Sequence, residues 1–145
     1  MCGIGEQFLH SNEFPRLEVL NAMAIAMRYR GPDDEGIYRA GHIGLVHRRL
    51  SIRDLSAAGH CPMGSEDGQV QVVFNGEIYN WRELRHEPEV QGVGFISQCD
   101  TEVVLHGYRV WGPDHATRLW LILWLEFWFR LVAGEKQSEL MAFQA

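Results

Sequence analysis

The sequence has few cysteines, and none is placed as a disulfide partner or a metal ligand would be. Cys2, Cys61 and Cys99 are an odd number at wide spacings in a chain of 145 residues. Disulfide scaffolds have dense, even sets of cysteines, and zinc sites have closely spaced pairs. The cysteine content therefore excludes a disulfide framework and predicts no metal site.

Basic charge and long apolar runs are also scarce. The chain has 13 lysines and arginines against 19 acidic residues, with a net charge of −6. This balance speaks against nucleic acid and anionic membrane surfaces as partners. The longest apolar run, "LWLILWL" before Glu126, is too short to cross a bilayer. Residues 1–14 have neither the basic start nor the apolar stretch of a signal peptide, so the expected compartment is the cytosol.

The remaining composition is ordinary for one globular domain. Apolar residues make up 46% of the chain and charged residues 22%, in a length sufficient to bury a core. Residues 11–32 predict one helix, with Pro15 in its first turn and Gly31-Pro32 after its end. Residues 33–52 predict two short strands around a turn at Ala40-Gly41.

The second half is predicted to be loop, strand and two helices. Residues 53–69 are rich in Gly, Ser, Asp and Pro and predict a loop, and residues 70–80 predict a strand that runs into a turn at Asn75-Gly76. We expect Asn80 to cap a helix and Pro88 to end it. Residues 100–113 predict the last helix. Its apolar face is predicted to hold Val104, Tyr108 and Trp111.

The first residues pose a separate question, because a cysteine follows Met1 directly. An isolated cysteine is most often inert packing. Aminopeptidases, however, remove Met1 when the next residue is small, and Cys2 would then carry a thiol and a free α-amine on one carbon. That pair is a nucleophile with its own base. Position alone does not decide between these two interpretations.

Five motifs in order decide it, and each would be weak evidence alone. Together they strongly resemble the class II glutamine amidotransferase domain, the glutaminase half of glutamine-dependent asparagine synthetases, over about residues 1–119. The motifs are "MCGI" at 1–4, "RGPDDEG" at 30–36, "HRRLSIRDLSAAGHCPM" at 47–63, "VFNGEIYNWRELR" at 73–85 and "CDTEVVLHGY" at 99–108.

The resemblance implies an α+β fold, an Ntn-hydrolase-type α/β/β/α sandwich of two antiparallel sheets. We expect this sandwich to be incomplete, because residues 120–145 form an apolar tail without the motifs of the family's later strands. Truncation, a shifted reading frame and natural divergence would each produce such a tail. We treat residues 1–119 as the amidotransferase domain and the tail as no separate domain.

The resemblance also implies a chemistry, the hydrolysis of the side-chain amide of glutamine by Cys2. Asn75 and Gly76 would supply the oxyanion donors, Arg49 would bind the α-carboxylate, and Asp100 would bind the α-ammonium. The implied glutamine-binding set is Arg49, Leu50, Ile52, Asn75, Gly76, Glu77 and Asp100.

Plainer interpretations of single residues stay open from the sequence. Asn75-Gly76 is also a strong hairpin signal, Arg48-Arg49 could be a solvated surface pair, and Asp100 could be a helix cap. The chain departs from the family at Cys61, where glutamine is usual, and at Cys99, where a hydroxyl residue is usual. Glu6 and Gln7 are unexpectedly polar for the family's first strand.

The chain contains no "SGGxDS"-like pyrophosphate loop. We therefore expect no cofactor in this chain, and expect ATP and Mg²⁺ only in a missing synthetase domain. The expected partners are L-glutamine and an ammonia-accepting synthetase domain or subunit. Two other hypotheses remain: a catalytically incompetent truncated or frameshifted remnant, and a glutamine-binding module.

Overall fold

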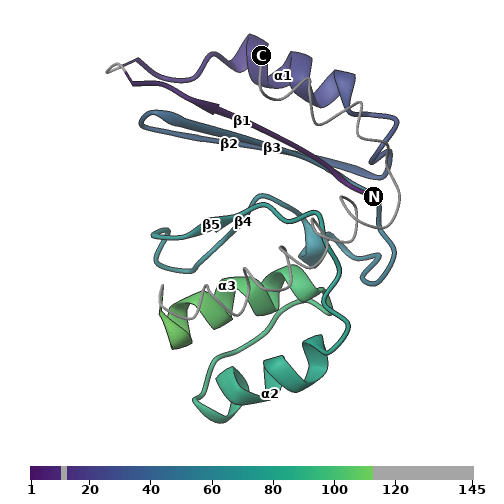
Figure 1. Ribbon diagram of the computed structural model, residues 1–145, viewed down its shortest axis with the longest axis vertical. Coiled ribbons are helices and arrows are strands. Elements are labelled where there is room, and N and C mark those ends of the chain that lie inside the picture. Colours follow the sequence, from purple (N-terminus) through teal and green to yellow (C-terminus); the bar gives the residue numbers. More distant parts are fainter. Residues whose placement is uncertain (11–12, 113–145) are drawn as a thin grey trace, which may run out of the picture. The chain divides into compact units, whose positions relative to one another are not determined.

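The computed structural model describes residues 1–10 and 13–112 (Figure 1). The predictions made for residues 113–145, including the divergent tail, lie outside the described residues. In the described part, no helix is long and apolar enough to span a membrane. The elements in chain order are β1 (Gly3–Phe8), α1 (Leu17–Ala26), β2 (Asp34–Ala40), β3 (Ile43–Arg49), the short 3₁₀ helix η1 (Ala57–Gly59), β4 (Met63–Gly64), β5 (Gln71–Val72), α2 (Trp81–Val90) and α3 (Asp100–Trp111).

The first three strands form an antiparallel sheet in the order β1-β3-β2. The hairpin predicted at residues 33–52 is confirmed. Gly41 makes its turn, with a φ of 51° that L side chains rarely adopt. The register pairs Gly3 with Arg48 and Gly36 with His47. This register places Leu50, the residue after Arg49, beside the start of the chain.

Helix α1 covers one face of this sheet (Figure 1). Leu20 and Ala24 of the helix pack on Val46 of β3, and all three are fully buried. The sheet offers glycine where the helix comes closest. A Cβ on Gly44 would lie 2.8 Å from a Leu20 methyl carbon, and one on Gly3 would lie 2.8 Å from Met27 Cβ. These small residues allow the helix to lie close to the strands.

The opposite face of the sheet is covered in part by the segment before β4. A Cβ on Gly36 would lie only 1.9 Å from the carbonyl oxygen of Cys61, so backbone lies directly on the strand. The imidazole Nε2 of His47, also on this face, is 3.1 Å from the carbonyl oxygen of Phe74. The antiparallel pair β4–β5 follows this contact segment. Helices and antiparallel sheets together make the α+β fold that was predicted.

Helix α3 was predicted in the right place, but its predicted apolar face is only partly buried, with Val104 packed against the cluster of Ile78 and Trp81. Val103 and Leu105 are buried, whereas Tyr108 is 41% exposed. Leu105 packs with Cys61, Met63 and Cys99, while Val103 packs with Ile78 and Trp81. The helix thus has apolar neighbours on two sides, between β4–β5 and α2 in Figure 1. A single-stripe pattern cannot describe a helix that is packed in this way.

The other two helices differ from prediction at their ends. Pro88 does not end α2, which runs to Val90 with the buried proline in its last turn. Asn80 is the N-cap residue, but its side chain makes no capping hydrogen bond. Helix α1 begins at Leu17, after Pro15, and ends at Ala26. The expected helix of residues 11–32 was therefore too long, because Met27 already leaves helical geometry.

Strand β1 explains the polar residues that were unexpected in a first strand. It lies at an edge of the three-stranded sheet, and Glu6 is exposed there. The Gln7 side-chain oxygen accepts a hydrogen bond from the Arg16 backbone N–H at 3.1 Å. Phe8 is 57% exposed at the end of the strand.

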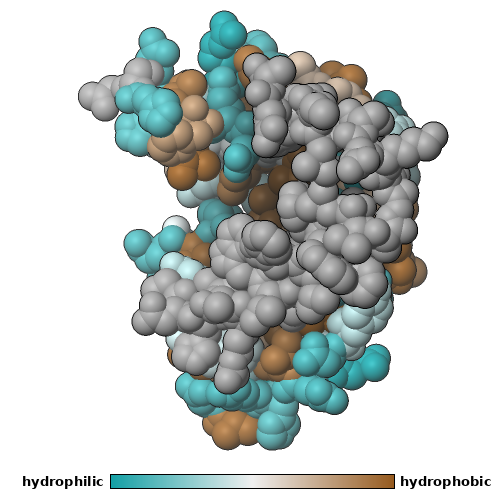
Figure 2. All heavy atoms as spheres, viewed as in Figure 1, coloured by the Kyte–Doolittle hydropathy of each residue, from teal (hydrophilic) through white to brown (hydrophobic). Residues whose placement is uncertain are grey.

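Figure 2 shows that exposed apolar residues of the described part lie among hydrophilic ones on the face drawn.

Candidate active site

Cys2 lies directly before β1 and is half-buried. Its Sγ accepts a hydrogen bond from the Leu50 backbone N–H at 3.4 Å, and the Arg30 Nε donates to its carbonyl oxygen at 3.1 Å. The β1–β3 register is the cause, because pairing Gly3 with Arg48 carries Cys2 to the end of β3. Hydrogen bonds to both its side chain and its backbone thus hold the predicted nucleophile in place. Leu50, which was expected to wall the pocket, is in contact with this thiol.

Arg49 is buried and organises the loop that follows β3. Its Nη1 donates to the Ser56 carbonyl oxygen at 2.9 Å, and its Nη2 donates to the carbonyl oxygen of Asp54. A Cβ on Gly59 would lie 2.1 Å from Nη2, so this glycine makes room for the guanidinium. A guanidinium has five N–H donors, so these two bonds leave donors for a ligand carboxylate.

Neighbouring Arg48 points to the other face of the sheet, as strand alternation predicts. Its Nε donates to the Gly31 carbonyl oxygen at 2.8 Å, and its Nη1 lies 2.5 Å from Glu35 Oε2. Arg48 and Arg49 are 6% and 8% exposed. The alternative interpretation of the two arginines as a solvated surface pair is therefore wrong.

Asp100 begins α3 and is buried. Its Oδ2 accepts a hydrogen bond from the Ile78 backbone N–H at 2.9 Å. This bond ties the start of α3 to the segment that contains Asn75 and Gly76. Glu77 lies in the same segment, is exposed, and pairs its carboxylate with the Arg53 guanidinium.

Asn75 and Gly76 are half-buried and lie between β5 and α2. They do not join two strands, so the hairpin interpretation is wrong. A Cβ on Gly76 would lie 2.6 Å from the Phe74 ring, which favours glycine here. Burial lowers the pKa of His47, whose Nε2 contacts the Phe74 carbonyl oxygen. A neutral His47 therefore donates from Nε2 and holds the chain one residue before Asn75.

Ile52 is 74% exposed, so its side chain does not form a buried wall in this structure. Cys61 and Cys99, which replace the family's usual residues, are both buried in one apolar cluster. Burial raises the pKa of the Cys61 thiol to about 12. That thiol is protonated and unreactive at neutral pH.

Asp54 is the main site residue that the sequence did not reveal. Its Oδ1 accepts from the Ser56 backbone N–H at 2.8 Å and from the Ser56 hydroxyl at 2.6 Å, a local turn that the spacing Asp-x-Ser could have indicated. Its Oδ2 accepts from the Gln98 backbone N–H at 2.7 Å. The Gln98 bond is the largest cause of a lowered Asp54 pKa, followed by the bonds from Ser56.

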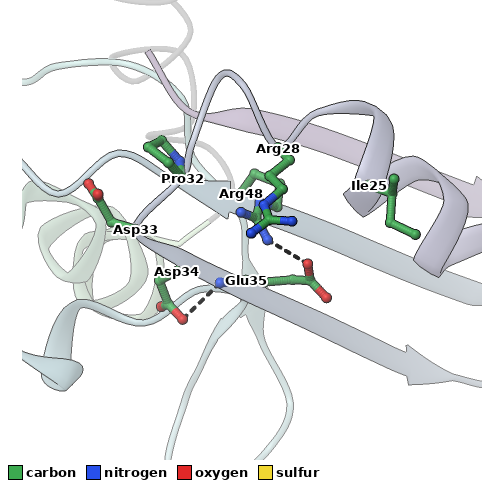
Figure 3. Close-up of a pocket in the computed structure, with 7 residues that line it drawn as sticks. All are labelled: Ile25, Arg28, Pro32, Asp33, Asp34, Glu35 and Arg48. Atoms are coloured by element: carbon green, nitrogen blue, oxygen red, sulfur yellow. Dashed lines mark hydrogen bonds and ion pairs between the residues drawn. The ribbon is translucent and has the colours of Figure 1, made fainter.

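A cavity of about 490 Å³ lies beside Arg48 and Glu35 (Figure 3). Figure 3 shows Arg48 directed toward Glu35, with Arg28 beside them. The cavity contains none of the predicted glutamine-binding residues. Its lining residues are Ile25, Arg28, Pro32, Asp33, Asp34, Glu35 and Arg48.

Comparison with known proteins assigns the chain to a family. The sequence profile of a glutamine amidotransferase domain matches residues 1–135. The chain belongs to this family. The resemblance drawn from the five motifs is thereby confirmed, and the residues around Cys2 are those of an amidotransferase domain.

Similar proteins are glutamine-hydrolysing asparagine synthetases. Asparagine synthetase 1 of Bacillus subtilis (strain 168) is 41% identical over 102 residues, which cover 70% of this chain and 16% of that protein. A putative asparagine synthetase 2 of Methanocaldococcus jannaschii is 39% identical over 132 residues, covering 79% of this chain and 25% of that protein. Asparagine synthetase 1 of Arabidopsis thaliana is 37% identical over 121 residues, covering 82% of this chain and 20% of that protein. The amidotransferase chain thus spans a quarter or less of each of these relatives.

Two links connect the predicted site residues in the amidotransferase domain. Cys2 is joined to the Arg49-Leu50 end of β3, and Asp100 is joined to Ile78 after Gly76-Glu77. The loop of Asp54 connects these two groups through Gln98. Ile52 stands outside them.

Proposed function

We propose that this domain, an Ntn-hydrolase-type sandwich, hydrolyses the side-chain amide of L-glutamine to glutamate and ammonia. The observation that carries the proposal is the placement of Cys2, held against the Leu50 N–H at the end of β3 and next to buried Arg49. Membership of the amidotransferase family supports it.

In the proposed reaction, removal of Met1 frees the α-amine of Cys2. The amine takes the proton of the thiol, and the sulfur bonds to the amide carbon. The proton then passes to the leaving nitrogen, the C–N bond breaks, and ammonia departs from a thioester. Water hydrolyses the thioester, which releases glutamate and restores the thiol. The proposed attack, loss of ammonia and hydrolysis together need no cofactor.

The oxyanion of the tetrahedral intermediate is assigned to the Asn75 side-chain amide and the Gly76 N–H. Each preorganised donor of this kind contributes about 2.7–4 kcal/mol to the transition state. The His47 bond to the Phe74 carbonyl supports this assignment, because it anchors the backbone directly before Asn75.

Recognition of the amino-acid end is assigned to Arg49 and Asp100, with Leu50, Ile52 and Glu77 around them. Arg49 binds the α-carboxylate with the donors left by Ser56 and Asp54, and Asp100 binds the α-ammonium. The released ammonia passes to a synthetase domain or subunit, to which ATP and Mg²⁺ also belong. The names of the similar asparagine synthetases support this acceptor.

The direct test is to incubate the purified chain, with Met1 removal verified by mass spectrometry, with L-glutamine. We expect glutamate and ammonia in equal amounts. L-asparagine should release no ammonia, because its side chain is one methylene too short to reach Cys2. Calorimetric binding of glutamine without ammonia release would identify a binding module instead. Absence of both would identify an incompetent remnant.

We predict that Asp100→Asn raises the KM for glutamine and leaves kcat largely unchanged. Asparagine keeps an oxygen that can accept the Ile78 N–H, so only the charge offered to the α-ammonium is lost. Losing a hydrogen bond to a charged group costs about 1.5–3 kcal/mol, or roughly tenfold to a hundredfold in affinity.

The matched control is Asp67→Asn. Asp67 pairs with Arg109 at 3.0 Å on the exposed side of the β4–β5 turn. Steady-state kinetics should show no change for this variant. An unchanged KM in Asp100→Asn would remove Asp100 from the binding scheme.

A further inference from the structure

Asp54 contacts both ends of the proposed recognition site. Its carbonyl oxygen accepts a hydrogen bond from the guanidinium of Arg49. Its carboxylate accepts the N–H of Gln98 at 2.7 Å, two residues before Asp100. Asp54 is itself buried, at 8% exposure. One buried residue therefore connects Arg49, assigned to the α-carboxylate, with the segment that presents Asp100, assigned to the α-ammonium.

The segment before Asp100 is also held from α3 and α2. Glu102 accepts the backbone N–H groups of Ile96 and Ser97, each at 2.7 Å, and Arg85 donates to the Ser97 carbonyl oxygen at 2.8 Å. These contacts fix the segment to its own helices. The Asp54–Gln98 bond differs, because it fixes the segment to the loop that surrounds Arg49.

We infer that Asp54 is a positioning residue that sets the separation between the Arg49 guanidinium and the Asp100 carboxylate, and so selects L-glutamine over D-glutamine. The inference rests on the proposed function. With the amide held at Cys2, the two enantiomers exchange the places of their carboxylate and ammonium. A site rejects the wrong enantiomer only if the two charged groups that recognise these ends cannot shift toward each other's places.

A carboxylate suits this role better than its amide. Asp54 uses one oxygen toward Ser56 and the other toward Gln98, and every partner at these oxygens is a donor. Asparagine has one acceptor oxygen and one NH₂ group. Two donors of Ser56 face one oxygen and a single donor of Gln98 faces the other, so the asparagine oxygen is favoured at Ser56. Its NH₂ then faces the Gln98 N–H, and the connection to Gln98 is lost.

The test compares Asp54→Asn with Ser56→Ala. The second variant removes only the hydroxyl that donates to Asp54 and caps η1, and leaves the Gln98 bond in place. The measured quantity is the ratio of kcat/KM for L-glutamine over D-glutamine. For an enantiomer that is not turned over, its inhibition constant against L-glutamine is compared with the KM for L-glutamine instead. We expect the ratio to fall roughly tenfold in Asp54→Asn, with a higher KM for L-glutamine, since a charge-assisted bond is lost.

We expect Ser56→Ala to keep the ratio within about twofold of the parent, because the Asp54–Gln98 bond stays in place although the hydroxyl's bonds to the Asp54 carboxylate and the Ala58 N–H are lost. Should Asp54→Asn not fold, Asp54→Glu serves instead, since it keeps the charge but displaces the carboxylate by one methylene. An equal loss of activity toward both enantiomers, or an unchanged ratio, would overturn the inference while the proposed function stands. A parent chain that releases ammonia from neither enantiomer would overturn both.

Discussion

Replacing Cys2 with alanine is expected to lower ammonia release from glutamine by roughly a thousandfold or more, to the background rate. Neither of the other two cysteines is expected to take over covalent catalysis, because both are buried. For Cys61, burial also raises the pKa of the thiol to about 12. The fold should survive, because Cys2 is half-buried and its thiol makes two weak hydrogen bonds, one from the Leu50 N–H at 3.4 Å and one to the Leu50 carbonyl oxygen at 3.9 Å.

The control for this experiment is Cys99→Ser. Cys99 is buried next to Asp100, with Sγ 3.1 Å from the Ser97 hydroxyl, so a serine at this position retains a hydrogen-bonding partner. We expect its activity to stay within a few-fold of the parent. Ammonia release and circular dichroism are measured for both variants. Parental activity in Cys2→Ala would show that the thiol at position 2 is not the nucleophile.

The largest effect on stability is expected from Gly36→Ala. The new Cβ would lie 1.9 Å from the Cys61 carbonyl oxygen and 2.8 Å from its carbonyl carbon. These are backbone atoms, so the segment before β4 must move away from the sheet as a unit. Overpacking costs typically 1–3 kcal/mol, and a clash with backbone favours the upper end, about 3 kcal/mol. That is a large share of the roughly 5–15 kcal/mol by which a domain is stable.

Gly94→Ala is the matched control, because a Cβ there has no atom within 4 Å and the backbone is not in the left-handed region. Thermal unfolding of the full chain is measured for both variants. We expect Gly36→Ala to melt roughly 10 °C lower than the parent and Gly94→Ala to melt within about 2 °C of it. Equal melting temperatures would mean that residues 60–61 are not packed on β2.

The sequence could predict the β2–β3 hairpin and α3, because short strands around a glycine turn and an extended helical pattern are local signals. It could not predict which side of α3 is buried, since that depends on packing against both β4–β5 and α2. Pro88 shows the same limit. Its burial in the last turn of α2 outweighs the missing backbone donor.

For the candidate site, motif resemblance could propose Cys2, Arg49 and Asp100 but not the contacts that hold them. Arg49 bonds to backbone carbonyl oxygens, and such acceptors leave no mark in a sequence because every residue has one. The bond from Gln98 to Asp54 joins residues 44 positions apart. No local pattern reports a contact at that separation.

The edge strand β1 also imposes an order on biosynthesis. Its only strand partner among the described residues is β3, which begins at Ile43, forty residues after Gly3. At about 5–20 residues per second, the ribosome needs roughly 2–8 s to make the intervening chain. During that interval Cys2 has not yet been drawn against Leu50, and the Met1–Cys2 bond lies in an unpaired nascent segment. The proposed removal of Met1 can begin in this interval, and an affinity tag fused ahead of Met1 would prevent it.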